Sequence, residues 1–372
     1  MPEYTIKDIA RLAGVSTGTV SRVLNGADNI APELYEKTMA VLRSTNYLKA
    51  KHRVVANPKS NSGRAIKRIS VIFSDMTPAW NGHPLANEYL RGIENACRMA
   101  GFRYEVFFLN PESTTDQFAE TLTQSDGILI KGTLKEVDIF KFIPPDFPVV
   151  GFGVYNPVMT CPQFAIDNYS VGTVMTQYLL SMGHRRIAFV NHEENHKMFI
   201  LRELGYVETM RSAGLYNEDL VIRCKSASSV DRSPLHALPN MDSILEKLLN
   251  LSPRPTAVIL VNDWAAAGFY QACRQRSISV PDTFSICGVD NISICDILDP
   301  PLTSFELPWS REAEFATATL IEMINGIGRH RLNQTSIQYL GGKLVVRNSV
   351  KKIYLPEKSV DGLFQAIVPA EI

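Results

Sequence analysis

The feature that most restricts how this chain can fold is residues 4–25 (YTIKDIARLAGVSTGTVSRVLN), which predict two short helices joined by a tight turn. Apolar residues recur at three- and four-residue spacing in the first helix, at Ile6, Ile9, Ala10 and Ala13. This spacing gives a helix one buried face. Gly14 permits the sharp turn, and the Ser16 hydroxyl can cap the second helix. We therefore expect a helix-turn-helix, a shape that fits a DNA major groove.

The predicted second helix turns its polar positions away from its core. Val15, Val20 and Leu24 are expected to be buried. The positions left outside carry short hydrogen-bonding groups, a glycine and one arginine, namely Thr17, Gly18, Ser21, Arg22 and Asn25. The outer face of this helix is therefore the candidate for contact with DNA.

Basic residues are concentrated around this motif. Residues 1–68 hold 12 Lys or Arg against 5 Asp or Glu, although the whole chain is balanced at 38 of each. A basic N-terminal lobe on an acidic body favours contact with phosphate groups at one end of the molecule. A charged run by itself indicates only a solvated surface, and its overlap with the helix-turn-helix is what favours nucleic acid.

The string DIARLAGVSTGTVSRVLNG resembles the headpiece of the lactose-repressor (LacI) family of bacterial transcription regulators. Later segments resemble the effector-binding core of the same family and follow in the same order: GHRRIAFV at 183–190, RELGY at 202–206, VND at 261–263, CGVDN at 287–291, PPLTSFE at 300–306 and LVVRNS at 344–349. The resemblance covers about residues 4–350. Several ordered matches are far more specific than a single motif.

The resemblance implies an all-α helix-turn-helix headpiece followed by an α/β core, similar to periplasmic binding proteins, of two Rossmann-like subdomains. We expect a headpiece at 1–48, a basic linker at 49–68, an effector-binding and dimerisation core at 69–350 and a C-terminal extension at 351–372. The second subdomain is expected to start near residue 166, and the chain to cross between subdomains near 302 and 335.

The linker departs from the family pattern. Family members usually follow the tyrosine that matches Tyr47 with Pro-Asn-x-x-Ala-Arg-x-Leu, which folds on DNA into a hinge helix whose leucine enters the minor groove. Here the linker is longer than usual, and Ala56 stands at the position of the leucine. Alanine is too short to enter the minor groove as leucine does, and Val54 or Val55 are the candidates to take its place. Two alternatives stay open: a hinge helix, or a basic strap that follows the DNA backbone.

Beyond the linker, short β-rich runs alternate with helical patterns. Parallel strands are expected at 69–73, 104–109, 127–130 and 148–153 in the first subdomain, and at 186–191, 257–262 and 285–290 in the second. Helices are expected at 32–45, 85–100, 168–182 and 264–275. Such βαβ units bind ligands at the carboxyl ends of their strands.

Polar residues stand where the strands of the second subdomain end, at Asn191, Asn262 and Asp290. Taken singly, such residues are often turn formers or helix caps. The resemblance implies that Asn262 and Asp290 hydrogen-bond the effector, and that Arg202 in RELGY clamps it. A solvated helix position is the alternative for Arg202.

Aromatic residues point to the class of effector. The resemblance places Trp309 where sugar-responsive relatives stack an aromatic ring, and an indole suits either a pyranose or a purine. Trp80 and Asp75 follow the first core strand, where the family has its other cleft wall, although a buried core residue is the alternative for Trp80. Residues 151–153 are glycine-rich where several relatives place a polar contact. We expect a sugar or sugar derivative, with a purine or another metabolite as the alternative.

On the DNA side, the resemblance places Thr17, Gly18 and Arg22 against the bases, with Arg22 able to bind a guanine edge in bidentate fashion. The other positions placed at the DNA, mainly at phosphates, are Thr5, Ser16, Thr19, Ser21, Asn25 and Tyr47. Because one headpiece addresses half a site, we expect a homodimer on a near-palindromic operator. The expected function is a ligand-responsive transcription regulator, most simply a repressor.

Other classes of protein are disfavoured. The chain has no GxSxG, GxxxxGK[ST], dinucleotide or HExxH motif, so we expect no enzyme, although Asp263, Asp290 and Arg202 could form an acid–base cleft. An exported sugar receptor is disfavoured by the headpiece and by the lack of a signal peptide. Six cysteines lie singly, and His192 and His196 are the only metal-like pair, for which a surface helix is expected. We expect no cofactor, metal or membrane contact, and a cytoplasmic, nucleoid-associated location.

Overall fold

The computed structural model describes residues 5–24, 31, 34–35, 37–38, 41–42, 67–74, 84–109, 122–132, 143–153, 155–157, 159–224, 240–327 and 334–354. Residues 5–24 form the two expected helices, α1 (Ile6–Ala13) and α2 (Thr17–Leu24), and Gly14 makes the turn with φ at 65°. Apolar residues of both helices pack with Leu42 into a small core. Most of the helix expected at 32–45 and most of the linker lie outside the described residues.

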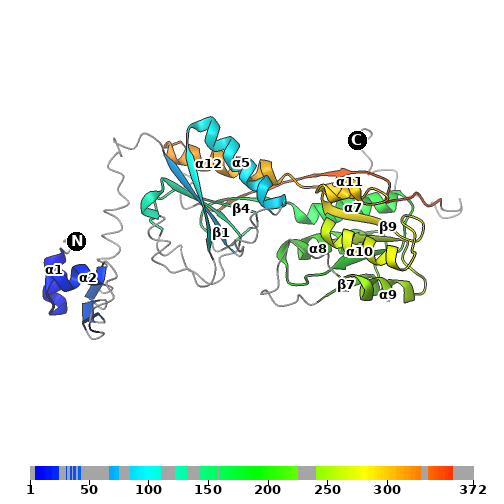
Figure 1. The fold of residues 1–372 in the computed structure, drawn as a ribbon, viewed down its shortest axis with the longest axis horizontal. Coiled ribbons are helices and arrows are strands. Elements are labelled where there is room, and N and C mark those ends of the chain that lie inside the picture. The colour runs from blue at the N-terminus through cyan, green and yellow to red at the C-terminus, as the bar shows by residue number, and fades with distance from the viewer. Residues whose placement is uncertain are drawn as a thin grey trace.

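The first subdomain contains a six-stranded sheet with the order β11-β5-β4-β3-β1-β2, in which every neighbouring pair is parallel. Its strands are β1 (Arg68–Ser74), β2 (Arg103–Leu109), β3 (Gly127–Lys131), β4 (Val149–Gly153), β5 (Pro162–Ile166) and β11 (Ser336–Leu340). Helices α5 (Pro84–Ala100) and α12 (Trp309–Ile324) lie side by side against this sheet (Figure 1). They come from opposite ends of the core sequence, and their contact joins the two ends.

The second subdomain contains another six-stranded sheet, with the order β12-β10-β9-β8-β6-β7 and one antiparallel edge pair, β10 with β12. Its strands are β6 (Ile187–Asn191), β7 (Val221–Arg223), β8 (Ala257–Leu260), β9 (Ser285–Asp290), β10 (Thr303–Glu306) and β12 (Lys343–Val345). The accompanying helices are α7 (Asn168–Ser181), α8 (Lys197–Ser212), the 3-10 helix η3 (Glu218–Leu220), α9 (Asp242–Asn250), α10 (Asp263–Gln275) and α11 (Ile294–Ile297). The structure thus confirms the expected fold class.

Three short connections join the subdomains. The chain passes from β5 to α7 at Asp167, from β10 to α12 at Leu307 and Pro308, and from β11 to β12 at Gly341 and Gly342. The last two lie a few residues later than the positions near 302 and 335 expected from the sequence. The reason is that β10 and β11 start directly after those positions, and the chain leaves each sheet only after the strand ends.

The three connections contact one another. The backbone N–H of Asp167 donates to the carbonyl of Leu340 at 3.0 Å, which ties the first connection to the third. A side chain at Gly342 would place its Cβ 2.0 Å from the carbonyl oxygen of Glu306, so glycine is required for the third connection to pass the end of β10, where the second connection starts. The connections therefore form one hinge region of closely packed backbone.

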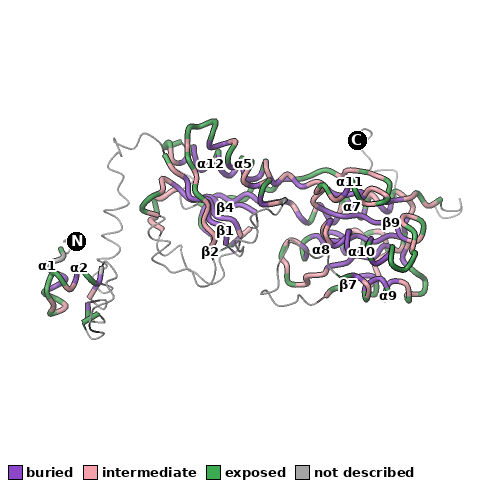
Figure 2. The backbone as a smooth tube through the Cα atoms, in the orientation of Figure 1, coloured by how far each residue is buried: buried purple, intermediate pink, exposed green. Residues whose placement is uncertain are grey.

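The interiors of both subdomains are apolar and join at the hinge. One cluster of buried side chains runs from the α5 and α12 face of the first sheet to the α7 and α8 face of the second. A second cluster lies between α9, α10 and the opposite face of the second sheet. Figure 2 shows the buried strands at the centre of each subdomain, with the exposed backbone on the outer helices and loops. The first cluster is the one that surrounds the buried polar groups described next.

Candidate functional site

The first candidate site is the outer face of the headpiece helices, whose orientation depends on two helix caps. Thr5 and Asp8 form a capping box on α1: the Thr5 N–H donates to Oδ2 of Asp8 at 2.9 Å, and the Asp8 N–H donates to the Thr5 hydroxyl at 3.3 Å. Ser16 accepts a hydrogen bond from the N–H of Thr19 at 3.0 Å and so caps α2. These caps fix where both helices begin and which way α2 faces.

The outer face of α2 carries positions that the sequence placed at DNA. Val20 and Val23 are buried on the inner face of this helix. Three of the predicted contact positions are exposed on the other side, namely Thr17, Gly18 and Arg22. Three further predicted positions lie in α2 without a described side chain or outside the described residues, namely Ser21, Asn25 and Tyr47. The structure therefore presents a short polar surface with one arginine.

The second candidate site lies where the subdomains meet, around the guanidinium of Arg202. Helix α8 carries this side chain into the interior, and only 2% of Arg202 is exposed. Its Nε donates to Oδ1 of Asn168 at 2.8 Å, one terminal nitrogen donates to the carbonyl of Val261, and the other lies 3.8 Å from Oδ1 of Asp290. The ring of Phe199 lies 5.4 Å from the guanidinium carbon. This burial excludes a solvated position for Arg202.

Asp290 ends β9 in a left-handed backbone conformation, with φ at 110°. A non-glycine residue in such a region costs on the order of 1–3 kcal/mol. Burial raises the pKa of the Asp290 carboxyl to about 8, against the lowering effect of the Arg202 charge. No described residue donates a hydrogen bond to its buried Oδ1. Because a buried oxygen without a hydrogen bond is costly, this atom is suited to a partner from outside the chain.

The first subdomain contributes aromatic rings to the same place. Trp309 begins α12 and is 3% exposed. Its ring meets that of Tyr89 edge to face with centroids 5.4 Å apart, and Tyr89 in turn meets Phe152 at 5.5 Å. Within the described part of the chain, Nε1 of Trp309 has no acceptor. Burial raises the pKa of the Tyr89 hydroxyl, and the charges of Glu312 and Asp290, one from each subdomain, raise it further.

A carboxylate that the sequence analysis did not single out also lies here. Glu312 is fully buried on α12, one turn after Trp309. Its Oε1 accepts from the backbone N–H of Gly153 at 3.0 Å, whereas Oε2 receives no hydrogen bond from any residue in the described ranges. Burial raises the pKa of this carboxyl to about 8, and the charge of Lys131 opposes the rise. One signal was present in the sequence: Glu312 falls on the apolar face of α12, beside Ala313.

A pH series tests the burial of Glu312. Between about pH 4.5 and about pH 8 the folded chain keeps a proton that the unfolded chain releases, so this group lowers stability as the pH rises. One pKa unit corresponds to about 1.4 kcal/mol. We expect Glu312→Gln to gain about 1–3 kcal/mol in unfolding free energy over the wild type from pH 5 to pH 8, measured with urea. A gap between the two proteins that does not widen with pH would contradict this burial.

The polar residues Asn262 and Asp263, which follow β8, form hydrogen bonds within the second subdomain. Oδ1 of Asn262 caps α10 by accepting from the N–H of Ala265 at 2.8 Å, which leaves the amide nitrogen of Asn262 as the group able to face a ligand. Asp263 is buried and accepts from the Ser304 hydroxyl at 2.7 Å and from the N–H of Ile292 at 3.0 Å. The side-chain carbonyl of Asn262 is therefore a helix cap, which was the alternative role considered for this residue from the sequence.

Further predicted residues lie elsewhere. Asp75 and Trp80 fall outside the described residues. His192 and His196 lie in the loop before α8, not on a surface helix as expected, because both rings pack against Phe199 with centroids 5.6 and 4.1 Å away. All six cysteines are free. Among the residues that the structure describes, no group of three His, Cys, Asp or Glu is placed to hold a metal ion.

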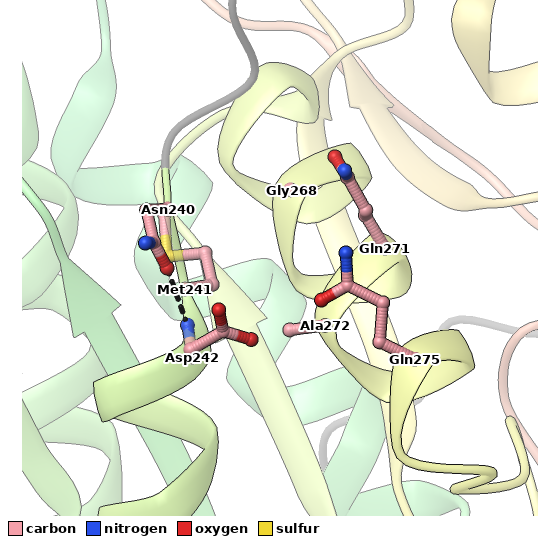
Figure 3. Close-up of a pocket in the computed structure, with 7 residues that line it drawn as sticks. All are labelled: Asn240, Met241, Asp242, Gly268, Gln271, Ala272 and Gln275. Carbon is pink, nitrogen blue, oxygen red and sulfur yellow. Dashed lines mark hydrogen bonds between the residues drawn. The ribbon is translucent and has the colours of Figure 1, made fainter.

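A separate cavity of about 190 Å³ lies within the second subdomain, between the start of α9 and the outer face of α10 (Figure 3). Its polar walls are Asn240, Asp242, Gln271 and Gln275, and the Asp242 N–H donates to Oδ1 of Asn240 at 2.9 Å. None of the residues lining this cavity belongs to the junction around Arg202. The cavity and the junction are therefore two different places.

Comparisons with known proteins agree with a headpiece followed by a ligand-binding core. The family model for bacterial regulatory proteins of the lacI family matches residues 5–49, and the model for a periplasmic binding protein-like domain matches residues 176–350. The ribose operon repressor of Escherichia coli is 30% identical over 342 residues, covering 90% of this chain and 94% of that protein. The chain belongs to the LacI family of bacterial regulatory proteins.

Further LacI-family proteins are similar over nearly the whole chain. The repressor PurR of Vibrio campbellii is 29% identical over 358 residues, covering 94% of this chain and 99% of that protein. A transcriptional regulator CelR–cellobiose complex has a TM-score of 0.64 at 22% identity, covering 93% of this chain and all of that one. The lac repressor dimer bound to operator and the anti-inducer ONPF has a TM-score of 0.60 at 19% identity, with 94% of this chain covered.

Membership of the LacI family gives this chain its general role. It is a DNA-binding transcriptional regulator with an effector-binding core, and the named relatives are regulators rather than enzymes. In the described part of the chain, the helices are all too short or too polar to cross a membrane.

Proposed function

We propose that this protein is a transcriptional repressor whose operator affinity is controlled by a sugar or sugar derivative bound between the two core subdomains. It acts as a homodimer on a near-palindromic operator, in the cytoplasm at the nucleoid. Binding of the effector closes the subdomains at the hinge and changes the spacing of the two headpieces. Such a coupling is typically worth about 1–3 kcal/mol.

The observation that carries the proposal is the set of buried polar atoms at the subdomain junction that form no hydrogen bond with any described residue. Asp290 of the second subdomain offers an acceptor, and Trp309 of the first offers a donor. Sugar hydroxyls both donate and accept, and the C–H face of a sugar packs on aromatic rings such as those of Trp309 and Tyr89. A sugar that bonds to both walls would therefore hold the subdomains together.

Tryptophan fluorescence tests the effector. Full-length protein is titrated with D-ribose, cellobiose, D-ribose 5-phosphate and adenine. A saturable change with a sugar, reduced in Trp309→Phe, supports the proposal. A response to adenine but to no sugar favours a purine as the effector. This second candidate is suggested by the similarity to PurR, and a purine also stacks on flat aromatic rings.

The DNA side of the proposal assigns base contacts to Thr17, Gly18 and Arg22. Phosphate contacts are assigned mainly to the other headpiece positions, namely Thr5, Ser16, Thr19, Ser21, Asn25 and Tyr47. Because the hydroxyl of Thr5 already donates to Asp8 at 2.6 Å, we expect the backbone at the start of α1 to contribute to phosphate binding there. The linker, as a hinge helix or a basic strap, extends this surface.

Arg22→Ala is expected to reduce the preference for operator over random DNA by roughly 1–3 kcal/mol. The reason is that an exposed arginine on α2 can bind a guanine edge, a contact that random sequences do not repeat. Fluorescence anisotropy with operator and random duplexes measures the preference. Arg11→Ala on α1 is the matched control, because its side chain is 79% exposed and is expected to affect both duplexes equally. Loss of effector affinity in Arg22→Ala would contradict the separation of headpiece and core.

A further inference from the structure

Helix α8 carries apolar side chains on two opposite faces. Its inner face is buried in the second subdomain and includes Phe199 and Tyr206. Its outer face also carries three apolar side chains, and Ile200, Leu201 and Leu204 are 46%, 40% and 43% exposed. A helix that is apolar all round is typical of one that is covered on both sides, and a contiguous exposed apolar patch marks an interaction surface.

The neighbouring helix continues this apolar surface. Helix α7 packs against α8 and exposes Tyr169 and Val174. The helices on the opposite face of the same sheet, α9 and α10, are different, because their exposed positions carry only polar side chains such as Glu246 and Gln271. The exposed apolar surface therefore belongs to one face of the second subdomain.

Opposite charges border the exposed leucines along α8. Lys197 begins the helix, and Glu208 follows the leucines. Both side chains are exposed. Positions 197, 201, 204 and 208 follow one another at intervals of four, three and four residues, the spacing at which side chains form one stripe along a helix. In the direction of the chain, this stripe reads cation, leucine, leucine, anion.

This order of side chains is complementary to itself when it is reversed. If a second α8 packs antiparallel about a two-fold axis, Leu201 of one copy meets Leu204 of the other, and Lys197 meets Glu208 at both ends of the contact. In a parallel pair, each charge would instead meet a like charge, which is unfavourable. The stripe therefore fits an antiparallel second copy of the same helix.

We propose that the outer face of α8, formed by Lys197, Ile200, Leu201, Leu204 and Glu208, joins two homodimers of this chain into a tetramer through this antiparallel contact. The inference rests on the homodimer of the proposed function and adds a second contact to it. The linker connects the headpiece to the first subdomain at β1, whereas α8 belongs to the second subdomain. A contact through α8 does not itself set the spacing of two headpieces on one operator, so it adds to the contact that holds the homodimer.

Sedimentation equilibrium of the full-length protein, without DNA or effector, tests the contact. We expect the wild type to have the mass of four chains. We expect Leu201→Glu to have the mass of two, with a tetramer dissociation constant at least about tenfold higher, because a carboxylate replaces leucine at two symmetry-related places. The matched control is Met99→Glu on α5, where the side chain is 83% exposed and lies outside the α8 face, and it is expected to keep the mass of four chains.

Three results overturn the inference. The first is the same mass for the wild type and Leu201→Glu, whatever that mass is. The second is a fall from two chains to one in Leu201→Glu, because α8 would then hold the homodimer itself. The third is a wild type of one chain, which also overturns the homodimer of the proposed function and so separates the two failures.

A charge exchange tests the antiparallel pairing without changing a leucine. Lys197 and Glu208 lie about 16 Å apart along α8, too far to pair within one chain. Lys197→Glu places like charges together at both ends and is expected to raise the tetramer dissociation constant about three- to tenfold. The single change is made at Lys197 because Glu208 also accepts from the Tyr169 hydroxyl at 2.6 Å. The double variant Lys197→Glu/Glu208→Lys restores opposite charges and is expected to regain the wild-type constant, whereas a double variant no tighter than Lys197→Glu overturns the inference.

Discussion

Replacing Arg202 by alanine is expected to lower the unfolding free energy of the core by roughly 3–5 kcal/mol. The side chain is buried, donates hydrogen bonds to Asn168 and to the carbonyl of Val261, and lies 3.8 Å from the carboxyl of Asp290. Its removal leaves two acceptors without their shared donor and Asp290 without its nearby cation. Buried acceptors without a donor are costly, and the left-handed backbone of Asp290 adds strain that the contact with Arg202 helps to hold.

Urea unfolding at pH 7 measures this loss, with Arg211→Ala as the control. Arg211 lies on the same helix and is exposed, with its guanidinium carbon 4.6 Å from the centre of the Tyr216 ring, so its removal is expected to cost less than about 1 kcal/mol. A similar loss in both variants would show that the bonds of Arg202 are not the cause. The effector response is expected to disappear in Arg202→Ala alone.

Gly172→Val is expected to destabilise the second subdomain by roughly 3 kcal/mol or more. Helices α7 and α8 approach each other backbone to backbone at Gly172. A Cβ added at this glycine would lie 1.9 Å from the carbonyl oxygen of Arg202, so a side chain does not fit between the helices. Gly205 makes the reciprocal approach, with its Cβ position 2.1 Å from the carbonyl oxygen of Tyr169. A side chain at either glycine forces the helices apart and moves Arg202 away from Asn168.

Gly341→Ala is the matched control for this prediction, because no described atom lies within 4 Å of the position its Cβ would take. Thermal unfolding and sugar titration of both variants are the measurements. Gly172→Val is expected to lose stability and effector affinity together, whereas Gly341→Ala keeps both. A stable Gly172→Val protein with normal effector affinity would show that the helices separate without moving the arginine.

The elements that the sequence predicted best are those whose pattern is local. The strands β1 and β9 are buried along nearly their whole length, so a short apolar run between turn residues was enough to find them. In contrast, β11 and β12 are mostly exposed or half-buried edge strands with no such run, and α8 has buried positions that include an arginine and a glycine. The existence of β11 and β12 depends on pairing with β5 and β10, which are distant in the sequence.

The candidate site shows the same division. Arg202, Asp290 and Trp309 were found because the motifs around them resemble a known family. Tyr89 and Glu312 were missed because their importance appears only when α5 and α12 pack together, more than two hundred residues apart along the chain. A carboxylate on the apolar face of a helix is a usable signal once the helix bounds are known.

The hinge connections also have a consequence for the synthesis of the protein. Neither core sheet is encoded by a continuous stretch, because β11 completes the first and β12 completes the second, both within residues 336–345. The headpiece therefore leaves the ribosome long before either sheet can close. A chain that ends before residue 336 would carry a DNA-binding headpiece on a core whose β5 and β10 edges have no neighbouring strand. Open edges of this kind pair readily with other chains, so aggregation and proteolysis would remove truncated products before they compete for the operator.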